Sequence, residues 1–85
     1  MSELHRPQMT VMQEDRRTER AIVGLLLDRT APQPWSAAEL VLEIGGEPPI
    51  TLDSIDRLQR AGIVHRCGDF VFATRAAREL DQVLA

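Results

Sequence analysis

Proline and glycine residues divide this chain into short segments, which limits what it can fold into. Pro32 and Pro34 bracket an extended loop, and two pairs, Gly-Gly at residues 45–46 and Pro-Pro at residues 48–49, interrupt the middle of the chain. Proline disrupts a helix interior, and glycine commonly ends a helix in the left-handed conformation. The pattern predicts short helices and strands, and 85 residues leave room for one domain with one core.

The first helix is predicted from its start signal and its apolar periodicity. Thr10 and Gln13 have the spacing of a capping box, in which each side chain accepts a hydrogen bond from the backbone of the other. The helix continues to about residue 27. Apolar residues at positions 21, 22, 25 and 26 fall on one side of it, whereas its amino-terminal half is charged all round.

The second helix has the clearest start signal in the chain. Ser36 and Glu39 have capping-box spacing, and Trp35 is placed to pack on Leu40 as a hydrophobic staple. The sequence therefore predicts a helix over residues 37–44, ended by the glycine pair that follows.

The third helix is predicted over residues 52 to about 61. The Pro-Pro pair is expected to exclude helix before Ile50, which makes Thr51 the N-cap. Leu52, Ile55 and Leu58 recur at helical spacing on the expected inner face. Gly62 is expected to end the helix in the left-handed conformation.

After Gly62 the apolar pattern alternates. Residues 63–67 and 70–74 are typical of strands, and Gly68-Asp69 between them is typical of a two-residue hairpin turn. The Phe70 and Phe72 stripe is expected in the core. A final helix is predicted over residues 75 to about 84, and its expected inward residues are Ala76, Leu80, Val83 and Leu84. The predicted class is α+β, with a flexible arm over residues 1–12 and the domain over residues 13–85.

Three runs of residues carry a resemblance to a known family. They are Ser36-Ala37-Ala38-Glu39-Leu40, Ile55-x-x-Leu58-x-x-Ala61-Gly62-Ile63-Val64-x-Arg66-x-Gly68-Asp69, and Thr74-x-x-Ala77-Arg78-x-Leu80. Over roughly residues 18–84 they resemble winged helix-turn-helix regulators of the MarR and ArsR kind. The resemblance implies a three-helix core, a two-stranded β wing and a C-terminal helix.

This resemblance implies a small transcriptional regulator that binds double-stranded DNA as a homodimer. The helix over residues 52–61 would enter the major groove, and the wing over residues 63–74 would contact the backbone or the minor groove. The charged half of the first helix and the final helix would form the dimer surface. The implied DNA contacts are Ser54, Arg57, Gln59, Arg60, His65 and Arg66.

The charge distribution leaves an alternative open. The chain has a net charge of −3, which opposes indiscriminate nucleic-acid binding, although residues 50–78 hold five arginines against three aspartates, a net +2. Asp53 and Asp56 would repel phosphate. As i,i+4 partners they would also reduce Arg57 and Arg60 to solvated ion pairs. The alternative function is a winged-helix protein–protein interaction module without DNA binding.

Other functional classes have weaker signals. A sensor using a cleft beneath Trp35 is a third interpretation. His65 and Cys67 share one strand face, but even with His5 they are too few for a zinc site, and no cofactor is expected. No phosphate-binding loop or catalytic set can be assembled, so the chain is not expected to be an enzyme.

The sequence also favours a cytoplasmic protein. Its single cysteine excludes an intramolecular disulfide. Its start has no apolar signal-peptide region, and its longest apolar run, residues 21–27, is too short to span a membrane.

Overall fold

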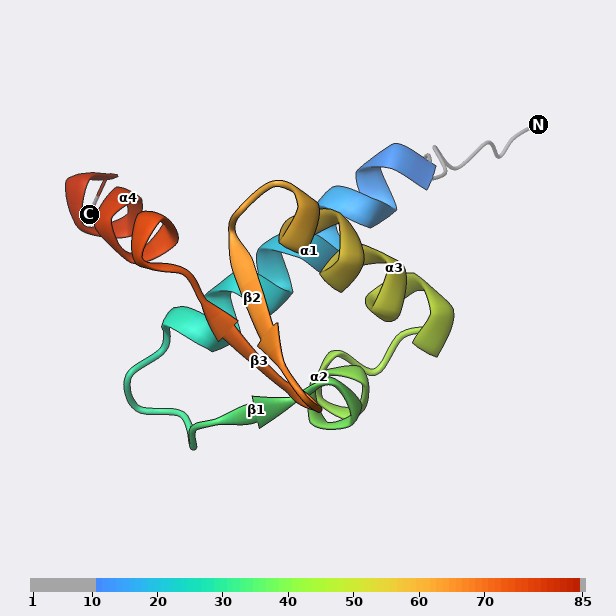
Figure 1. Cartoon of the computed structure of the whole chain (residues 1–85). Helices are drawn as coiled ribbons and strands as arrows, with labels where there is room; N and C mark the ends of the chain where they lie inside the picture. Colours follow the sequence, from blue (N-terminus) through green and yellow to red (C-terminus); the bar gives the residue numbers. More distant parts are fainter. Residues whose placement is uncertain (1–10, 85) are drawn as a thin grey trace.

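The computed structural model describes residues 11–84, which form four helices and a three-stranded antiparallel sheet (Figure 1). In chain order the elements are α1 (Val11–Leu27), β1 (Trp35–Ser36), α2 (Ala37–Ile44), α3 (Pro48–Arg60), β2 (Val64–Cys67), β3 (Phe70–Ala73) and α4 (Arg75–Leu84). The predicted α+β class is confirmed. The predicted two-stranded sheet is wrong, because β1 pairs with β3 and gives the order β1–β3–β2.

Two predictions concern residues outside this range. Residues 1–10 of the expected arm are not among those described, and neither is Thr10, the expected cap of the first helix. Residues 11 and 12 belong to α1.

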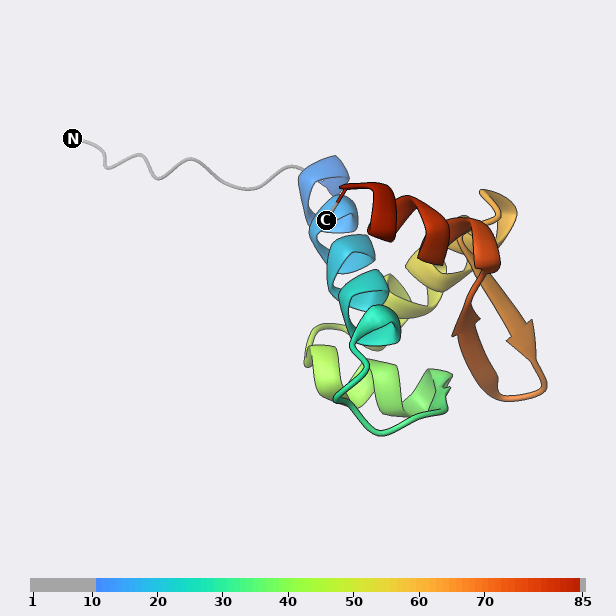
Figure 2. The ribbon, with the colours of Figure 1, turned by 90° about the vertical axis from the view of Figure 1, so that its left-hand side faces the viewer.

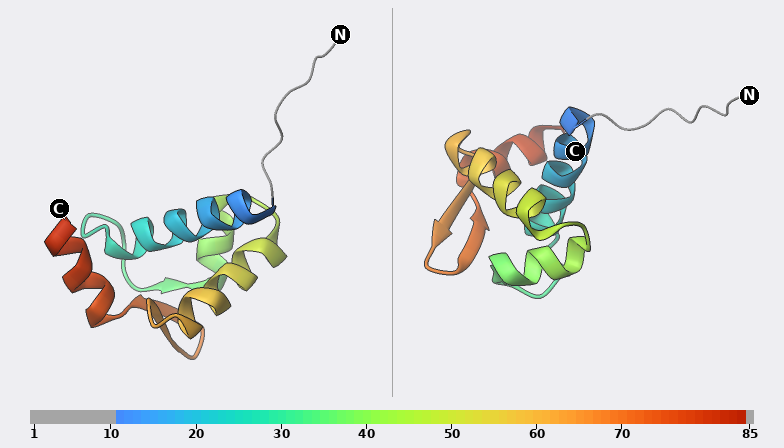
Figure 3. Two further views of the ribbon diagram at one scale, coloured as in Figure 1. Left: turned by 90° about the horizontal axis from the view of Figure 1, so that it is seen from above. Right: turned by 90° about the vertical axis from the view of Figure 1, so that its right-hand side faces the viewer.

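The helices surround one face of the small sheet. α1 lies beside α3, α2 lies across the end of this pair, and α4 lies at the edge of the molecule beside the carboxyl-terminal half of α1 (Figures 2 and 3). The core draws on α1, α2, α3, the hairpin strands and α4. Its buried apolar residues are Ile22, Leu26, Leu40, Ile55, Leu58, Val64, Val71, Ala73 and Ala77.

Local signals place α2 as predicted. The Glu39 backbone N–H donates to Ser36 Oγ at 3.0 Å, and the Ser36 N–H donates to Glu39 Oε1 at 2.9 Å, which completes the capping box. Gly45 ends the helix at φ +77°, a conformation that glycine adopts without steric cost. Trp35 packs against the core that contains Leu40.

The start of α3 differs from the prediction. The helix begins at Pro48, with the two prolines in its first turn and Glu47 as the N-cap. The first N–H groups of a helix have no partner within it, so proline loses nothing there and its fixed φ suits the helix. Thr51 is therefore not the cap. It lies inside the helix and is 1% exposed.

The hairpin forms as predicted, but the predicted assignment of its inner and outer faces is wrong. Cys67 pairs with Phe70, which leaves Gly68 and Asp69 as the turn, with Gly68 at φ +60°. Because side chains alternate along a strand, Val71 and Ala73 enter the core, and Phe70 and Phe72 lie on the outer face. The prediction that both phenylalanines are core residues is wrong.

The apolar face of α4 is also not buried as predicted. Ala77 is the one residue of this helix that is buried within the described structure. Leu80, Val83 and Leu84 are 53%, 78% and 76% exposed, and Ala76 is exposed as well. All these residues fall on one side of the helix, so α4 presents an apolar face that residues 11–84 leave uncovered.

Candidate functional site

The six residues expected to contact DNA do not form one surface. Ser54 is 0% exposed, so the expectation that it points outward is wrong. Gln59 and Arg60 are exposed in the last turn of α3. His65 is exposed on the outer face of the sheet, where its ring lies 5.9 Å from that of Phe72. The other two, both arginines, are engaged within the chain.

Arg57 joins α3 to α1. Its Nε donates to Glu19 Oε2 at 2.8 Å, and its Nη2 lies 3.3 Å from Asp15 Oδ1. The same Nη2 donates to Ser54 Oγ at 2.8 Å, which gives the buried hydroxyl a partner. Arg57 is one-third exposed, and its guanidinium faces carboxylates of its own chain.

The electrostatics of Arg57 agree with this geometry. The hydrogen bond to Glu19 raises the pKa of the guanidinium above its ordinary value, partial burial opposes the shift, and the charge of Asp15 adds to it. The i,i+4 spacing of Arg57 with Asp53 suggested a local pair, but the contacts lie 38 and 42 positions away along the chain. No local pattern identifies such partners.

Arg66 of the hairpin lies close to a carboxylate of α3. It shares the inner face of the sheet with Val64 and Val71, and its Nη1 lies 3.6 Å from Asp56 Oδ1. Asp56 is half exposed, so this pair is solvated and weak. The guanidinium nonetheless turns toward a carboxylate of α3.

The solvent face of α3 therefore carries little positive charge. Its exposed residues include Leu52, Asp53, Asp56, Gln59 and Arg60. Arg60 forms no ion pair with any described residue. Two carboxylates, those of Asp53 and Asp56, against the single guanidinium of Arg60 make a poor phosphate-binding surface.

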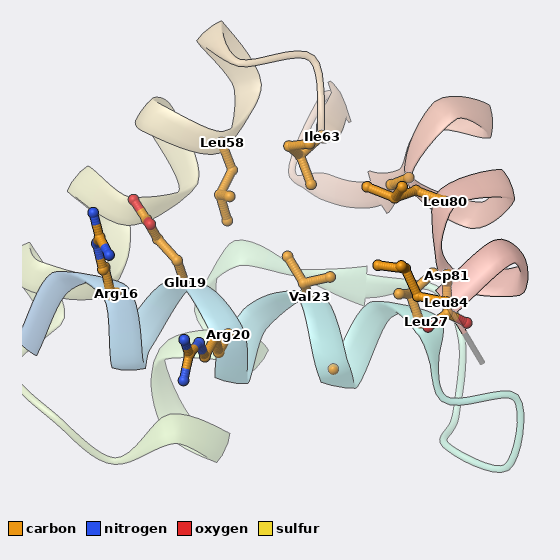
Figure 4. Close-up of a pocket in the computed structure, with 12 residues that line it drawn as sticks. Arg16, Glu19, Arg20, Val23, Leu27, Leu58, Ile63, Leu80, Asp81 and Leu84 are labelled. Atoms are coloured by element: carbon orange, nitrogen blue, oxygen red, sulfur yellow. The ribbon is translucent and has the colours of Figure 1, made fainter. Parts of the chain in front are cut away.

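A groove between α1, α3 and α4 is the second feature of the molecule (Figure 4). It has a volume of about 570 Å³ and an apolar floor. Figure 4 shows Val23, Leu58 and Ile63 converging at its centre, with Leu80 and Leu84 of α4 facing α1. Arg16, Glu19 and Arg20 lie along α1 at one end, and Asp81 lies at the α4 end.

No protein-family model matches the chain, and neither a curated protein nor a solved structure does.

Residues 11–84 give no support for a metal site or a membrane-spanning helix. No group of three or more His, Cys, Asp or Glu side chains is placed to hold a metal ion in this range, and Cys67 is an exposed free thiol. None of the helices described is both long enough and apolar enough to cross a bilayer. Trp35 Nε1 is buried and lacks a hydrogen-bond partner among the described residues, but the ring packs on the core.

Proposed function

We propose that this chain is a winged-helix protein–protein interaction module that works as a homodimer and does not read DNA. The observation that carries the proposal is the apolar face of α4. Three large aliphatic side chains, Leu80, Val83 and Leu84, are more than half exposed on one ten-residue helix. Contiguous exposed apolar surface on a soluble domain is typical of an interface with another protein.

A second copy of this chain fits the groove because the groove is self-complementary. It offers a hollow over Val23, Leu58 and Ile63, and projecting leucines at positions 80 and 84 beside it. A two-fold interface pairs the same patch on both subunits, so each hollow can take the leucines of the other copy.

Charge at the ends of the groove supports the same pairing. Arg16 and Arg20 lie at the α1 end, where Glu19 is already paired with Arg57. Asp81 lies at the α4 end, near the negative carboxyl terminus of the helix. A two-fold axis near Val23 exchanges these ends and brings each aspartate toward the arginines of the other copy. The charges thereby favour an antiparallel arrangement of the two grooves.

The dimer is tested by analytical ultracentrifugation over a concentration series. Leu80→Ser is expected to raise the dimer dissociation constant at least tenfold, since it removes an apolar side chain from the interface. Val83→Ser should also raise the dimer dissociation constant. Leu42→Ser is the matched control, because Leu42 is 80% exposed on a different face, and this variant should remain dimeric.

A charge exchange tests the orientation. Arg20→Glu is expected to weaken the dimer, and the added substitution Asp81→Arg is expected to restore it. The proposal is contradicted if the wild-type chain is still monomeric at about 100 µM, a concentration well above the usual dissociation constants of specific dimers. A dimer insensitive to both Leu80→Ser and Val83→Ser also contradicts it.

DNA binding is the second candidate function, favoured by the adjacency of α3 and β2 and by the exposure of Gln59, Arg60 and His65. With Arg60 as the free cation of the α3 face, we expect no retention of a mixed-sequence DNA duplex pool by the chain at about 50 mM salt, where phosphate contacts are strongest. Retention that is lost at about 200 mM salt and weakened tenfold by Arg60→Ala would establish DNA binding instead. Glu43→Ala, an exposed change on α2, serves as the control.

A further inference from the structure

A second apolar cleft lies between α2 and the start of α3, away from the dimer groove. Its volume is about 700 Å³, and it is lined by Ser36, Ala37, Ala38, Val41, Leu42, Leu52 and Asp69. Leu42 is 80% exposed and Leu52 is 41% exposed, so two large aliphatic side chains from different helices stand in solvent beside one hollow. We call this surface the α2–α3 cleft.

The walls of the α2–α3 cleft are held firmly. The capping box fixes the first turn of α2, and Gly45 fixes its end. The Ala37 N–H donates to the Asp69 carbonyl at 2.9 Å, which attaches the hairpin turn to the start of α2. The α2 wall and the hairpin turn are therefore fixed before a ligand binds, which lowers the ordering cost of binding.

The charge around the α2–α3 cleft is negative. Asp69 lines it, Asp53 follows Leu52 on the exposed face of α3, and Glu43 follows Leu42 on α2. Among the described residues, no arginine lines the cleft. Nucleic acid and anionic membrane surfaces would be repelled by this arrangement.

We infer that the α2–α3 cleft docks a basic amphipathic segment of another protein. A large aliphatic side chain of that segment would sit between Leu42 and Leu52, and its Lys or Arg side chains would face Asp53 and Asp69. Amphipathic segments bind apolar grooves in this way, and complementary charge sets their orientation and their rate of association. The inference rests on the proposed function in treating the chain as an interaction module, but it does not depend on the dimer.

The probe is a synthetic helical peptide with leucine at positions i, i+3, i+4 and i+7 and lysine elsewhere, followed by fluorescence anisotropy on the full chain. A peptide with glutamate in place of lysine is its counterpart. The lysine peptide is expected to bind the chain, and the glutamate peptide is expected not to bind. Leu42→Ser and Leu52→Ser should each weaken binding of the lysine peptide at least tenfold, and Asp53→Asn with Asp69→Asn should reduce its dependence on salt.

Leu80→Ser is the matched control, because it changes an equally apolar exposed residue on α4 and should leave peptide affinity unchanged. Failure of the lysine peptide to bind overturns the inference, as does binding that Leu80→Ser weakens as much as Leu42→Ser. Loss of the dimer in Leu42→Ser would show instead that the cleft is occupied by a second copy. The dimer is measured by mass and the docking by peptide titration, so either proposal can fail without the other.

Discussion

Ile55→Ala is expected to lower the free energy of unfolding by about 2–5 kcal/mol. Ile55 is fully buried on α3, in the core shared with α1 and the hairpin. The substitution removes three side-chain carbons and leaves a cavity that the packed neighbours fill only in part. A chain of this length has a total stability of about 4–13 kcal/mol, so the loss is a large share of it. Urea denaturation followed by circular dichroism measures the change.

Two variants set the scale for this effect. Ile55→Val removes one methylene and should cost about 0.5–1.5 kcal/mol. Leu42→Ala changes a residue that is 80% exposed and should stay within about 0.5 kcal/mol of wild type. If Ile55→Ala cost no more than Leu42→Ala, the packing of α3 described above would be incorrect.

Arg57→Ala is expected to cost about 1–3 kcal/mol of stability, the range for leaving a buried polar group without its hydrogen-bond partner. The change leaves Asp15 and Glu19 without their shared cation, and it removes the donor to the buried Ser54 hydroxyl. The partial exposure of all three charged groups keeps the loss below that of a fully buried pair. Denaturant unfolding at low and high salt measures both the loss and its screening.

Arg60→Ala is the matched control for Arg57→Ala. Both are α3 arginines, but Arg60 forms no ion pair with the described residues, so its loss should stay within about 0.5 kcal/mol. A double-mutant cycle of Arg57→Met with Glu19→Gln should show a coupling of at least about 0.5 kcal/mol. Equal effects of the two alanine variants, together with zero coupling, would show that Arg57 is not a structural link between the helices.

The structural role of Arg57 alters the interpretation of the charge pattern. The +2 charge of residues 50–78 favoured a nucleic-acid surface when each arginine was counted as free. Arg57 instead neutralises carboxylates of α1, and Arg66 faces Asp56. Of the implied DNA contacts, Gln59, Arg60 and His65 are exposed, and Ser54 is not. A net charge summed over a segment does not show which charges face solvent.

The sequence by itself determined the features that depend on residues close together in the chain. The Ser36–Glu39 capping box and the Gly68-Asp69 turn involve groups at most three positions apart, and Gly62 adopts its left-handed conformation, φ +80°, through its own backbone. Such interactions form whenever the local backbone is helical or turned, whatever the remainder of the chain does. These elements were therefore predictable to within a few residues.

Only the tertiary structure decided which apolar and charged groups meet. Alternation marks two faces of β3 but does not say which one is inward, and both carry apolar residues, so Val71 could not be chosen over Phe70. The two-residue strand β1 is too short to show any periodicity. It exists because Trp35 pairs with Val71 of β3. The uncovered face of α4 and the partners of Arg57 could not be predicted for the same reason. Contacts between distant segments depend on how the whole chain packs, and no spacing within one segment encodes them.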